Sequence, residues 1–434
     1  MTKGKLQELK DLFHSTYLIE DKFIIDVLCA NYISFLTKTD PVWTIIVGPS
    51  SGGKSEAVNA LSTCKYVHPI STITANTFVS GAKLGGGKPA SLLMKLSKGT
   101  DLERSGIITL KDFTSLMSEQ EANQKIIMAQ LREIFDSEYN KEFGTGQSIN
   151  WKGKVTVIAA STFKIHDLRQ QYSAMGERFL MYELAQPDRK EASSKAMTNQ
   201  ESGRMKEMRD AIAEMMRLYL NEVITIPSDL PPISEELKND LLDLAEMATR
   251  ARSDVKRAWY SPQKEILEVY PPEMPMRFAG SLQTLARCLM ILNWNETDEM
   301  TLPVKYHKIL HKYALDSITP GKRQAMQELA KYNVLETTAL GLKLDKPSST
   351  LRRYVEDLVA LGIAGREKGS GSKGDRWSIK PHYKKIIQKF EGITQEADEL
   401  NAMNVESQED LLAEAEEVRD DVPRDALDVE DTLL

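Results

Sequence analysis

The chain has 434 residues, a formal net charge of −7 and 41% hydrophobic residues. This length suits about two to four domains, and the composition is typical of a globular protein. No run of about 18 apolar residues is present, so we expect no membrane-spanning helix. The N-terminus lacks the apolar core of a signal peptide. The three cysteines lie far apart in apolar contexts, which argues against a disulfide or zinc framework and favours a cytoplasmic protein.

The net charge hides two regions of opposite sign. Residues 391–434 contain 16 acidic and two basic residues, a net charge of −14, whereas the preceding 390 residues carry +7. Residues 319–385 are rich in basic residues, with 14 basic and seven acidic ones. This contrast suggests a basic surface that binds nucleic acid, followed by a disordered acidic tail. The tail would compete with nucleic acid for the basic surface or bind a protein partner. The alternative is a solvated tail without a role.

An N-terminal helical segment is expected over residues 1–40, because apolar residues recur at three- and four-residue spacing, as in Leu9, Leu12 and Phe13. The apolar run Trp43–Val47 then predicts a buried strand, for which Pro41 marks the entry.

The most specific motif follows this strand. The eight residues after Val47 match G-x-x-x-x-G-K-S, and a helical pattern begins at Glu56. In such a loop the main-chain N–H groups surround phosphates, the lysine reaches the β- and γ-phosphates, and the serine binds Mg²⁺. We therefore expect ATP and Mg²⁺ as cofactors, held by Gly48, Pro49, Ser50, Ser51, Gly52, Gly53, Lys54 and Ser55. The later sequence Gly85–Pro89 resembles a second such loop, but proline replaces the required serine or threonine, so we interpret it as a flexible loop.

Residues 41–190 alternate short apolar strands with helical stretches, which predicts an α/β core: a parallel sheet with helices on both faces. The expected strands are Thr44–Val47, His68–Ile73, Gly106–Leu110 and Val155–Ala159. Asp112 follows the third strand, where an acid for the Mg²⁺ shell belongs. A hairpin is predicted around Gly144–Gly146, and it carries Lys141 and Lys152. Residues 191–315 are almost wholly helical in pattern and read as a helical lid.

Residues 319–385 predict a winged-helix DNA-binding domain, because three helices precede a hairpin whose turn is Lys368–Gly374. The third helix of such a domain enters the major groove, and the hairpin meets phosphates. The candidate DNA contacts are Ser348, Ser349, Thr350, Arg352 and Arg353 on the helix and Lys368, Lys373 and Arg376 on the hairpin. A winged helix used for protein contacts is the alternative.

The order of these parts resembles the AAA+ ATPases of the branch with a hairpin before the sensor strand. That branch includes the MCM-type helicases and the bacterial enhancer-binding activators. Thr162 ends a strand similar to sensor 1. Arg178, in Gly-Glu-Arg-Phe, is similar to the arginine finger of MCM-like proteins, and Arg277, in Met-Pro-Met-Arg-Phe, resembles sensor 2. Over residues 20–385 the whole set looks most like the MCM-like ATPases of phages and mobile elements.

This resemblance implies a homo-oligomer, with a hexameric ring as the expected form, in which Arg178 completes the ATP site of a neighbouring subunit. It also implies that Lys141 and Lys152 point into the ring channel and contact DNA. The expected catalytic set is Lys54, Asp112, Thr162, Arg178 and Arg277, with Ser55 and Asp112 as the metal-binding residues.

The sequence departs from the family at the strand that ends before Asp112. The family shows Asp-Glu there, whereas this chain has Lys111-Asp112, followed by Phe113. If Phe113 is aligned with the family's Asp-Glu-Phe, Asp112 takes the catalytic position and Lys111 replaces the metal acid. If the alignment is instead set by the length of the strand, Asp112 is the acid that binds the metal, and the glutamate that orients water is absent. We prefer this second alignment. Both alternatives predict slow hydrolysis.

The leading functional hypothesis is an AAA+ ATPase that acts on DNA, as a replicative helicase or replication initiator of a phage or mobile element. One alternative is an ATP-dependent transcription regulator, although the Gly-Ala-Phe-Thr-Gly-Ala loop of enhancer-binding activators is absent. A helicase loader or nucleotide-gated DNA-binding assembly with weak ATPase activity is the other.

Overall fold

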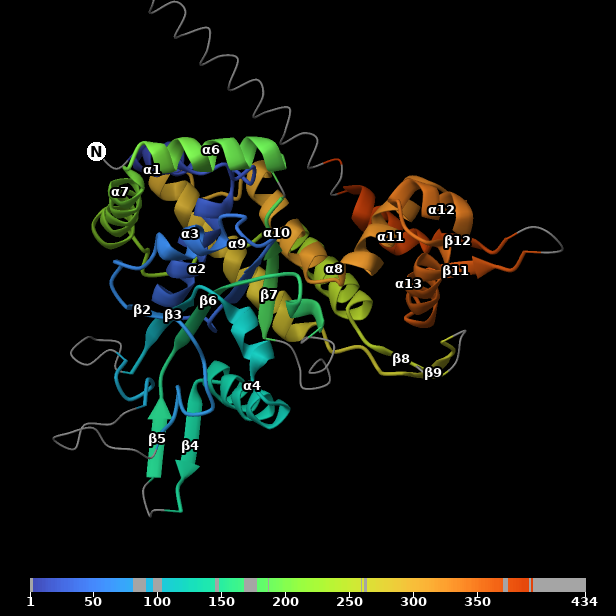
Figure 1. Cartoon of the computed structure of the whole chain (residues 1–434), viewed down its shortest axis with the longest axis horizontal. Helices are drawn as coiled ribbons and strands as arrows, with labels where there is room; N and C mark the ends of the chain where they lie inside the picture. Colours follow the sequence, from blue (N-terminus) through green and yellow to red (C-terminus); the bar gives the residue numbers. More distant parts are fainter. Residues whose placement is uncertain are drawn as a thin grey trace, which may run out of the picture.

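The computed structural model describes residues 3–80, 91–96, 104–144, 148–167, 178–185, 187–258, 260, 264–369, 374–389 and 392. Its centre is a parallel sheet of five strands in the order β2-β3-β6-β1-β7 (Figure 1). The strands are β1 (Trp43–Val47), β2 (Val67–Ile70), β3 (Gly106–Leu110), β6 (Val155–Ser161) and β7 (Phe179–Glu183). Because the strands are parallel, their carboxyl ends share one edge, where ligands of such sheets commonly bind.

Helices cover both faces of this sheet, as the burial of β1 on both sides requires. On one face, Ile46 belongs to a hydrophobic core with α2 (Ile24–Leu36) and α3 (Lys54–Asn59). On the other face, Ile45 packs in a second core with α4 (Glu121–Phe135). The predicted α/β core is therefore confirmed. β7 was not among the expected strands, although its apolar residues directly follow Arg178.

The remaining helices of the described chain flank this core. Two helices precede β1, as expected, and the second of them is α2. The other bounds are α1 (Lys5–Thr16), the 3-10 helix η2 (Phe113–Ser118), α6 (Arg189–Glu201), α7 (Met205–Leu218), the π-helix η4 (Tyr219–Val223), α8 (Glu235–Ala251), α9 (Met276–Thr297) and α10 (Val304–Asp316). None of the described helices is long and apolar enough to cross a membrane.

Two antiparallel hairpins extend from these helices and the sheet (Figure 1). The first, predicted from the sequence, joins β4 (Glu138–Glu142) to β5 (Ser148–Lys152). The second joins β8 (Val255–Arg257) to β9 (Ile266–Val269) and was not predicted within the segment 191–315, which was expected to be almost wholly helical. β-Branched residues at Val255, Ile266 and Val269 favour extended backbone there.

The C-terminal part of the described chain contains three helices and a small antiparallel sheet of order β10-β12-β11. The elements are α11 (Pro320–Lys331), β10 (Leu335–Glu336), α12 (Thr337–Leu344), α13 (Ser348–Ala360), β11 (Ala364–Glu367) and β12 (Arg376–Ile379). The three helices and the hairpin lie where the sequence predicts them, and β10 is additional. Apart from Gly392, the acidic segment 391–434 lies outside the described residues, as do Lys373 and Gly85–Pro89.

Packing within this part is tight. A Cβ atom at Gly321 of α11 would overlap the ring of Tyr354 on α13, so only glycine allows the two helices to lie this close. The buried indole of Trp377 on β12 donates to the Thr337 hydroxyl at 2.8 Å, which fixes β12 against α12. The three helices and the sheet therefore form one compact unit around Trp377.

A buried ion-pair network joins this unit to the central sheet. Arg323 of α11 donates to Glu183, the last residue of β7, at 2.6 Å and to Asp316 of α10 at 2.8 Å. Glu183 also lies 3.2 Å from His166 Nε2, and Lys312 lies 2.9 Å from Asp316. Burial opposes ionisation of Glu183, but the hydrogen bonds from His166 and Arg323 outweigh it and lower the pKa of Glu183 to about 2. α11 is thus attached to the carboxyl edge of the sheet.

Candidate functional site

The loop after β1 is shaped by its glycines. Gly53 has φ +80°, which disfavours residues with a side chain, and a Cβ there would lie 2.6 Å from Ile19 Cδ1. A Cβ at Gly52 would lie 3.0 Å from Pro49 Cγ, inside normal contact distance. The main chain can therefore curl tightly between β1 and α3, as a loop that surrounds phosphates requires.

Lys54 points back into this loop. Only 7% of the residue is exposed, and its Nζ donates to the main-chain oxygen of Pro49. Burial lowers the pKa of Lys54, an effect that the nearby charge of Asp112 opposes. An anion in the loop would replace a neutral carbonyl as the partner of this ammonium and favour its charged form. The geometry therefore suits phosphate binding.

Polar side chains from three strand ends meet beside this loop. Ser55 Oγ donates to the main-chain oxygen of Lys111 at 3.1 Å, which links α3 to the end of β3. Since β6 lies between β1 and β3, its end lies between the loop and Asp112. The Thr162 N–H donates to Thr114 Oγ1 at 3.1 Å, and the two threonine hydroxyls lie 3.3 Å apart. Lys54, Ser55, Asp112 and Thr162, predicted separately, therefore share one edge of the sheet.

Thr114 is a residue that sequence reasoning missed. It forms the centre of this polar cluster, because its hydroxyl also lies 3.1 Å from Ser161 Oγ and its N–H donates to Asp112 Oδ1 at 2.9 Å. Asp112 thereby caps the 3-10 helix η2. The available signal was a threonine two residues after the acid, the spacing at which an aspartate accepts a main-chain hydrogen bond.

Arg178 and Arg277 lie away from this edge. Arg178 directly precedes β7, at the opposite, amino edge of the sheet, and its Nη2 donates to Asp136 Oδ2 at 2.9 Å. Its side chain is only 10% exposed, so Arg178 is not an ordinary surface arginine. Arg277 lines a cavity of about 710 Å³ together with Asp40 and Asp136. Arg277 therefore lines an amino-edge cavity, Arg178 pairs with Asp136 beside it, and neither arginine reaches Lys54 within the same chain.

The β4–β5 hairpin presents its two lysines differently. Lys152 lies on the outer face with 78% of its side chain exposed, 3.5 Å from Glu138 on the neighbouring strand. Lys141 lies on the inner face in register with Ile149, half-buried, with its Nζ 5.0 Å from the Phe143 ring centroid. Of the two lysines, Lys152 is therefore the more accessible to a ligand, although it lies beside Glu138.

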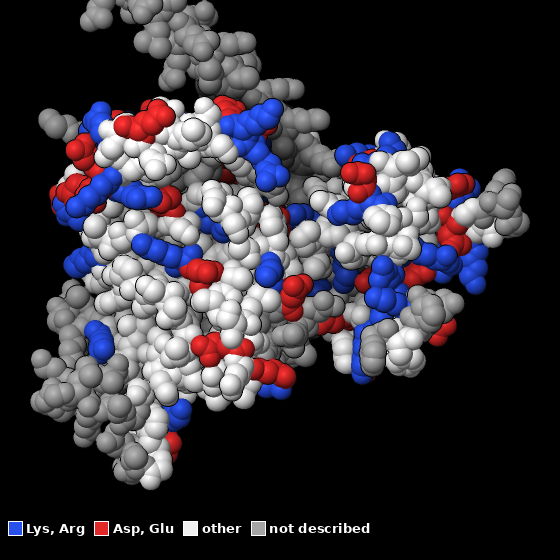
Figure 2. All heavy atoms as spheres, in the orientation of Figure 1, with Lys and Arg blue, Asp and Glu red and all other residues white. Residues whose placement is uncertain are grey.

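The predicted DNA-contacting residues of α13 lie on its first half and are partly paired. Arg352 donates to Glu356 at 3.0 Å and to Asp375 at 2.9 Å. Asp375 also accepts from Arg366 at 2.6 Å. Ser348, Ser349, Thr350 and Arg353 lie on the same stretch of helix, whereas Lys368 and Arg376 lie on the β11–β12 hairpin. Basic side chains gather over α13 and β11, interspersed with acidic ones (Figure 2).

The β8–β9 hairpin borders the same face of α13. Arg257 donates to Asp357 at 2.7 Å and to the main-chain oxygen of Arg353 at 2.9 Å. A cavity of about 730 Å³ between the hairpin and α13 is lined by Lys264, Glu265, Ile266, Ser349, Arg352, Arg353, Glu356, Val359, Ala360, Arg366 and Trp377. The groove beside α13 therefore contains main-chain and side-chain groups from both the hairpin and the helix.

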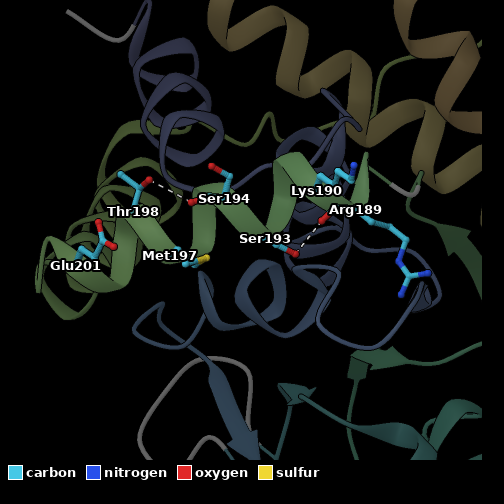
Figure 3. A pocket seen from close by; sticks show the side chains of 7 residues that line it. All are labelled: Arg189, Lys190, Ser193, Ser194, Met197, Thr198 and Glu201. Carbon is cyan, nitrogen blue, oxygen red and sulfur yellow. Dashed lines mark hydrogen bonds between the residues drawn. The ribbon is translucent and has the colours of Figure 1, made fainter.

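A further surface cavity of about 570 Å³ lies along α6, and all its described lining residues come from that helix (Figure 3). Two of its hydroxyls are satisfied within the helix: Ser193 donates to Arg189 and Thr198 to Ser194, at 2.8 and 3.1 Å. It contains no residue of the phosphate loop, so it is not part of the candidate site.

Comparison with known proteins identified no relative: no family model matches the chain, and no curated protein matches it. Among the described residues, no group of three or more His, Cys, Asp or Glu side chains is placed to hold a metal ion.

Proposed function

We propose that this chain is an ATP-binding AAA+ protein that works on DNA as a homo-oligomer, as a replicative helicase or initiator of a phage or mobile element. The observation that carries the proposal is the phosphate loop at the carboxyl edge of a parallel sheet, with Lys54 inside it and Ser55, Asp112 and Thr162 beside it. Ligands of open parallel sheets bind at this edge.

The position of the arginines supports an oligomer. Arg178 and Arg277 lie at the edge of the sheet opposite Lys54, so neither completes the phosphate site of its own chain. In a ring, the amino edge of one subunit faces the carboxyl edge of the next. Arg178 then leaves Asp136 and contacts the γ-phosphate of the neighbour. Such a cation contributes about 10³–10⁵ in hydrolysis rate in known phosphoryl-transfer enzymes.

The C-terminal unit supports DNA binding. Its three helices and three-stranded sheet suit a winged helix, with α13 as the groove-binding helix and Lys368 and Arg376 on the β11–β12 hairpin. In this proposal the acidic tail competes with DNA for the basic surface or binds a protein partner, and the protein works in the cytoplasm.

One observation favours a second candidate, a helicase loader or nucleotide-gated DNA-binding assembly with weak ATPase activity. In the alignment that matches Phe113 with the family's Asp-Glu-Phe, Lys111 replaces the metal acid, and its main-chain oxygen contacts Ser55. An assembly of this kind uses nucleotide binding as its switch and does not need rapid turnover.

The proposal is tested by equilibrium binding of ATP to wild type and to Lys54→Ala. We expect Lys54→Ala to weaken binding at least about 100-fold, since it removes a charge-assisted contact to phosphate. Lys88→Ala is the matched control, because Lys88 follows the other glycine-rich stretch, and it should bind as wild type does. Absence of binding by wild type refutes the proposal.

Particle size with ATP and DNA then tests the oligomer. We expect a larger particle in the presence of both ligands and ATP turnover that falls in Arg178→Ala without loss of ATP binding. A wild-type protein that binds ATP but remains monomeric under all conditions contradicts the role of Arg178. Rapid ATP turnover by the oligomer favours the helicase or initiator, whereas slow turnover favours the nucleotide-gated assembly.

A further inference from the structure

The β8–β9 hairpin belongs to the segment between α8 and α9, yet it lies beside α13 of the C-terminal unit (Figure 1). The buried residues of α13 are Leu351, Val355 and Leu358. Ser349, Arg352 and Arg353 lie on the other side of the helix and line the groove between α13 and the hairpin. The hairpin therefore forms a second wall along the face of α13 that carries the predicted DNA contacts.

One buried arginine connects the two walls. Arg257, whose side chain is 13% exposed, donates to Asp357 at 2.7 Å and to the main-chain oxygen of Arg353 at 2.9 Å. Its Nη1 donates to the main-chain oxygen of Lys264 at 2.8 Å. Because a guanidinium is planar and its donors have fixed directions, these bonds fix the position of Lys264 relative to α13.

The main chain of Lys264 has an uncommon conformation. Its φ is +48°, in the left-handed region that residues with a side chain rarely adopt. Such conformations persist where the surrounding structure holds them, and they are frequent at ligand sites. Lys264 is exposed and lines the groove. Arg257 thus holds a lysine in place at the edge of a surface that already carries predicted DNA contacts.

Several charges of the groove are neutralised within it. Arg352 and Arg366 both donate to Asp375, at 2.9 and 2.6 Å. Arg352 also donates to Glu356 at 3.0 Å. These side chains largely balance one another, so they leave little net charge for a ligand.

Two other cations of the groove are available, one on each wall. Within the described part of the chain, neither Lys264 nor Arg353 has a carboxylate partner for its own side chain, and Arg353 Nε donates instead to a main-chain oxygen at 3.2 Å. Glu265 is the lining carboxylate without a described ion pair. Two cations and one carboxylate leave one excess positive charge, which suits a phosphate of the DNA backbone.

We propose that the β8–β9 hairpin is part of the DNA-binding surface and that Lys264 contacts a backbone phosphate beside the site where α13 binds. The inference rests on the proposed DNA binding and adds to it an element from outside the C-terminal unit. Lys264 strengthens binding without reading sequence, because phosphates carry no base information. Arg257 is a positioning residue, which acts by holding Lys264 against α13.

The test is fluorescence anisotropy of the full-length protein with two DNA duplexes of unrelated sequence, over a series of salt concentrations. Lys264→Ala should lower affinity at least about threefold and reduce the salt slope by about 0.9 on both duplexes, because one phosphate contact is lost. Lys256→Ala is the matched control, since Lys256 lies on the same hairpin, is 56% exposed and faces Glu268. It should bind as wild type does, whereas Glu265→Gln, which removes a negative charge from the groove, should bind more tightly.

The role of Arg257 is tested in the same assay. Arg257→Met should weaken binding to both duplexes, and adding Lys264→Ala to it should cause no further loss or change of salt slope. Additive losses would show that Arg257 does not act through Lys264 and would overturn its positioning role. Thermal melting of each variant without DNA checks folding, which the exposed position of Lys264 should preserve.

The outcomes distinguish this inference from the proposed function. A wild type that binds both duplexes, with unchanged affinity and salt slope in Lys264→Ala, overturns the hairpin contact but leaves DNA binding by the C-terminal unit intact. An equal loss in Lys256→Ala also overturns it, because the effect is then one of general charge. Absence of DNA binding by wild type at low salt overturns the proposed action on DNA itself.

Discussion

The buried ion pair between Arg323 and Glu183 offers the most direct test of how the C-terminal unit is held. Arg323 binds Glu183 at 2.6 Å and Asp316 at 2.8 Å, and the three side chains are 13%, 9% and 7% exposed. Removing one partner of a buried ion pair costs about 3–5 kcal/mol, because the other charge stays buried without its partner. We expect Arg323→Met to lower the free energy of unfolding by about 3 kcal/mol, the lower end of this range. Glu183 remains in contact with His166, and Asp316 remains paired with Lys312.

Hydrogen exchange of the main-chain amides of α11 and β7 measures this loss. A cost of about 3 kcal/mol corresponds to exchange roughly 150-fold faster, where exchange reports the opening equilibrium. The double variant Glu183→Gln, Arg323→Met should recover part of the protection, because no unpaired charge remains at that position.

The matched control is Arg217→Met. Arg217 binds Glu214 and Glu222 at 2.7 and 2.8 Å, distances close to those of Arg323, but its side chain is 31% exposed. Exposed ion pairs contribute little to stability, so this variant should exchange nearly as wild type does. Equal and small changes in Arg323→Met and Arg217→Met would refute the argument from burial.

Two further predictions follow from the structure. The pKa of Glu183 is lowered from 4.5 to about 2, so its stabilisation is present above about pH 4.5 and is lost as the pH falls toward 2. Wild type should lose about 3 kcal/mol over this range in urea unfolding, whereas Glu183→Gln should lose less; parallel curves would contradict this assignment. In DNA-binding anisotropy at low salt, Lys152→Glu should weaken binding without changing the melting temperature. Lys141→Glu should also lower the melting temperature, because Lys141 packs on Phe143; unchanged DNA affinity in both variants removes the hairpin from the DNA interface.

The parts of the fold that sequence alone predicts are those with a local signal. The phosphate loop has a fixed spacing, β3 is a short strand of mostly apolar residues, and α11 begins at Pro320 and ends at Lys331 as expected. The β8–β9 hairpin was missed because its strands have three and four residues, too few for periodicity to distinguish them from helix.

The arrangement of the site required tertiary structure. Arg323 and Glu183 are 140 residues apart, and no local pattern indicates that they pair. Likewise, sequence motifs identified Arg178 and Arg277 separately, but only the fold shows that Arg178 pairs with Asp136 and that Arg277 lines a cavity with the same aspartate. The pairing of such buried charges depends on which residues the fold brings beside them, because the protein interior strongly disfavours an unpaired charge.

The phosphate loop and the ion-pair network of Glu183 and Arg323 lie at the ends of neighbouring strands. Val47, the last residue before the loop, is in register with Glu183, and the Leu184 N–H donates to the Val47 oxygen at 2.8 Å. A ligand that draws Lys54 from the Pro49 carbonyl acts on the loop that begins at this point. Glu183, at the end of β7, in turn contacts Arg323 on α11 at 2.6 Å. If nucleotide binds in this loop as proposed, the ion pair that holds α11 is the contact through which a shift of β7 would reach the C-terminal unit.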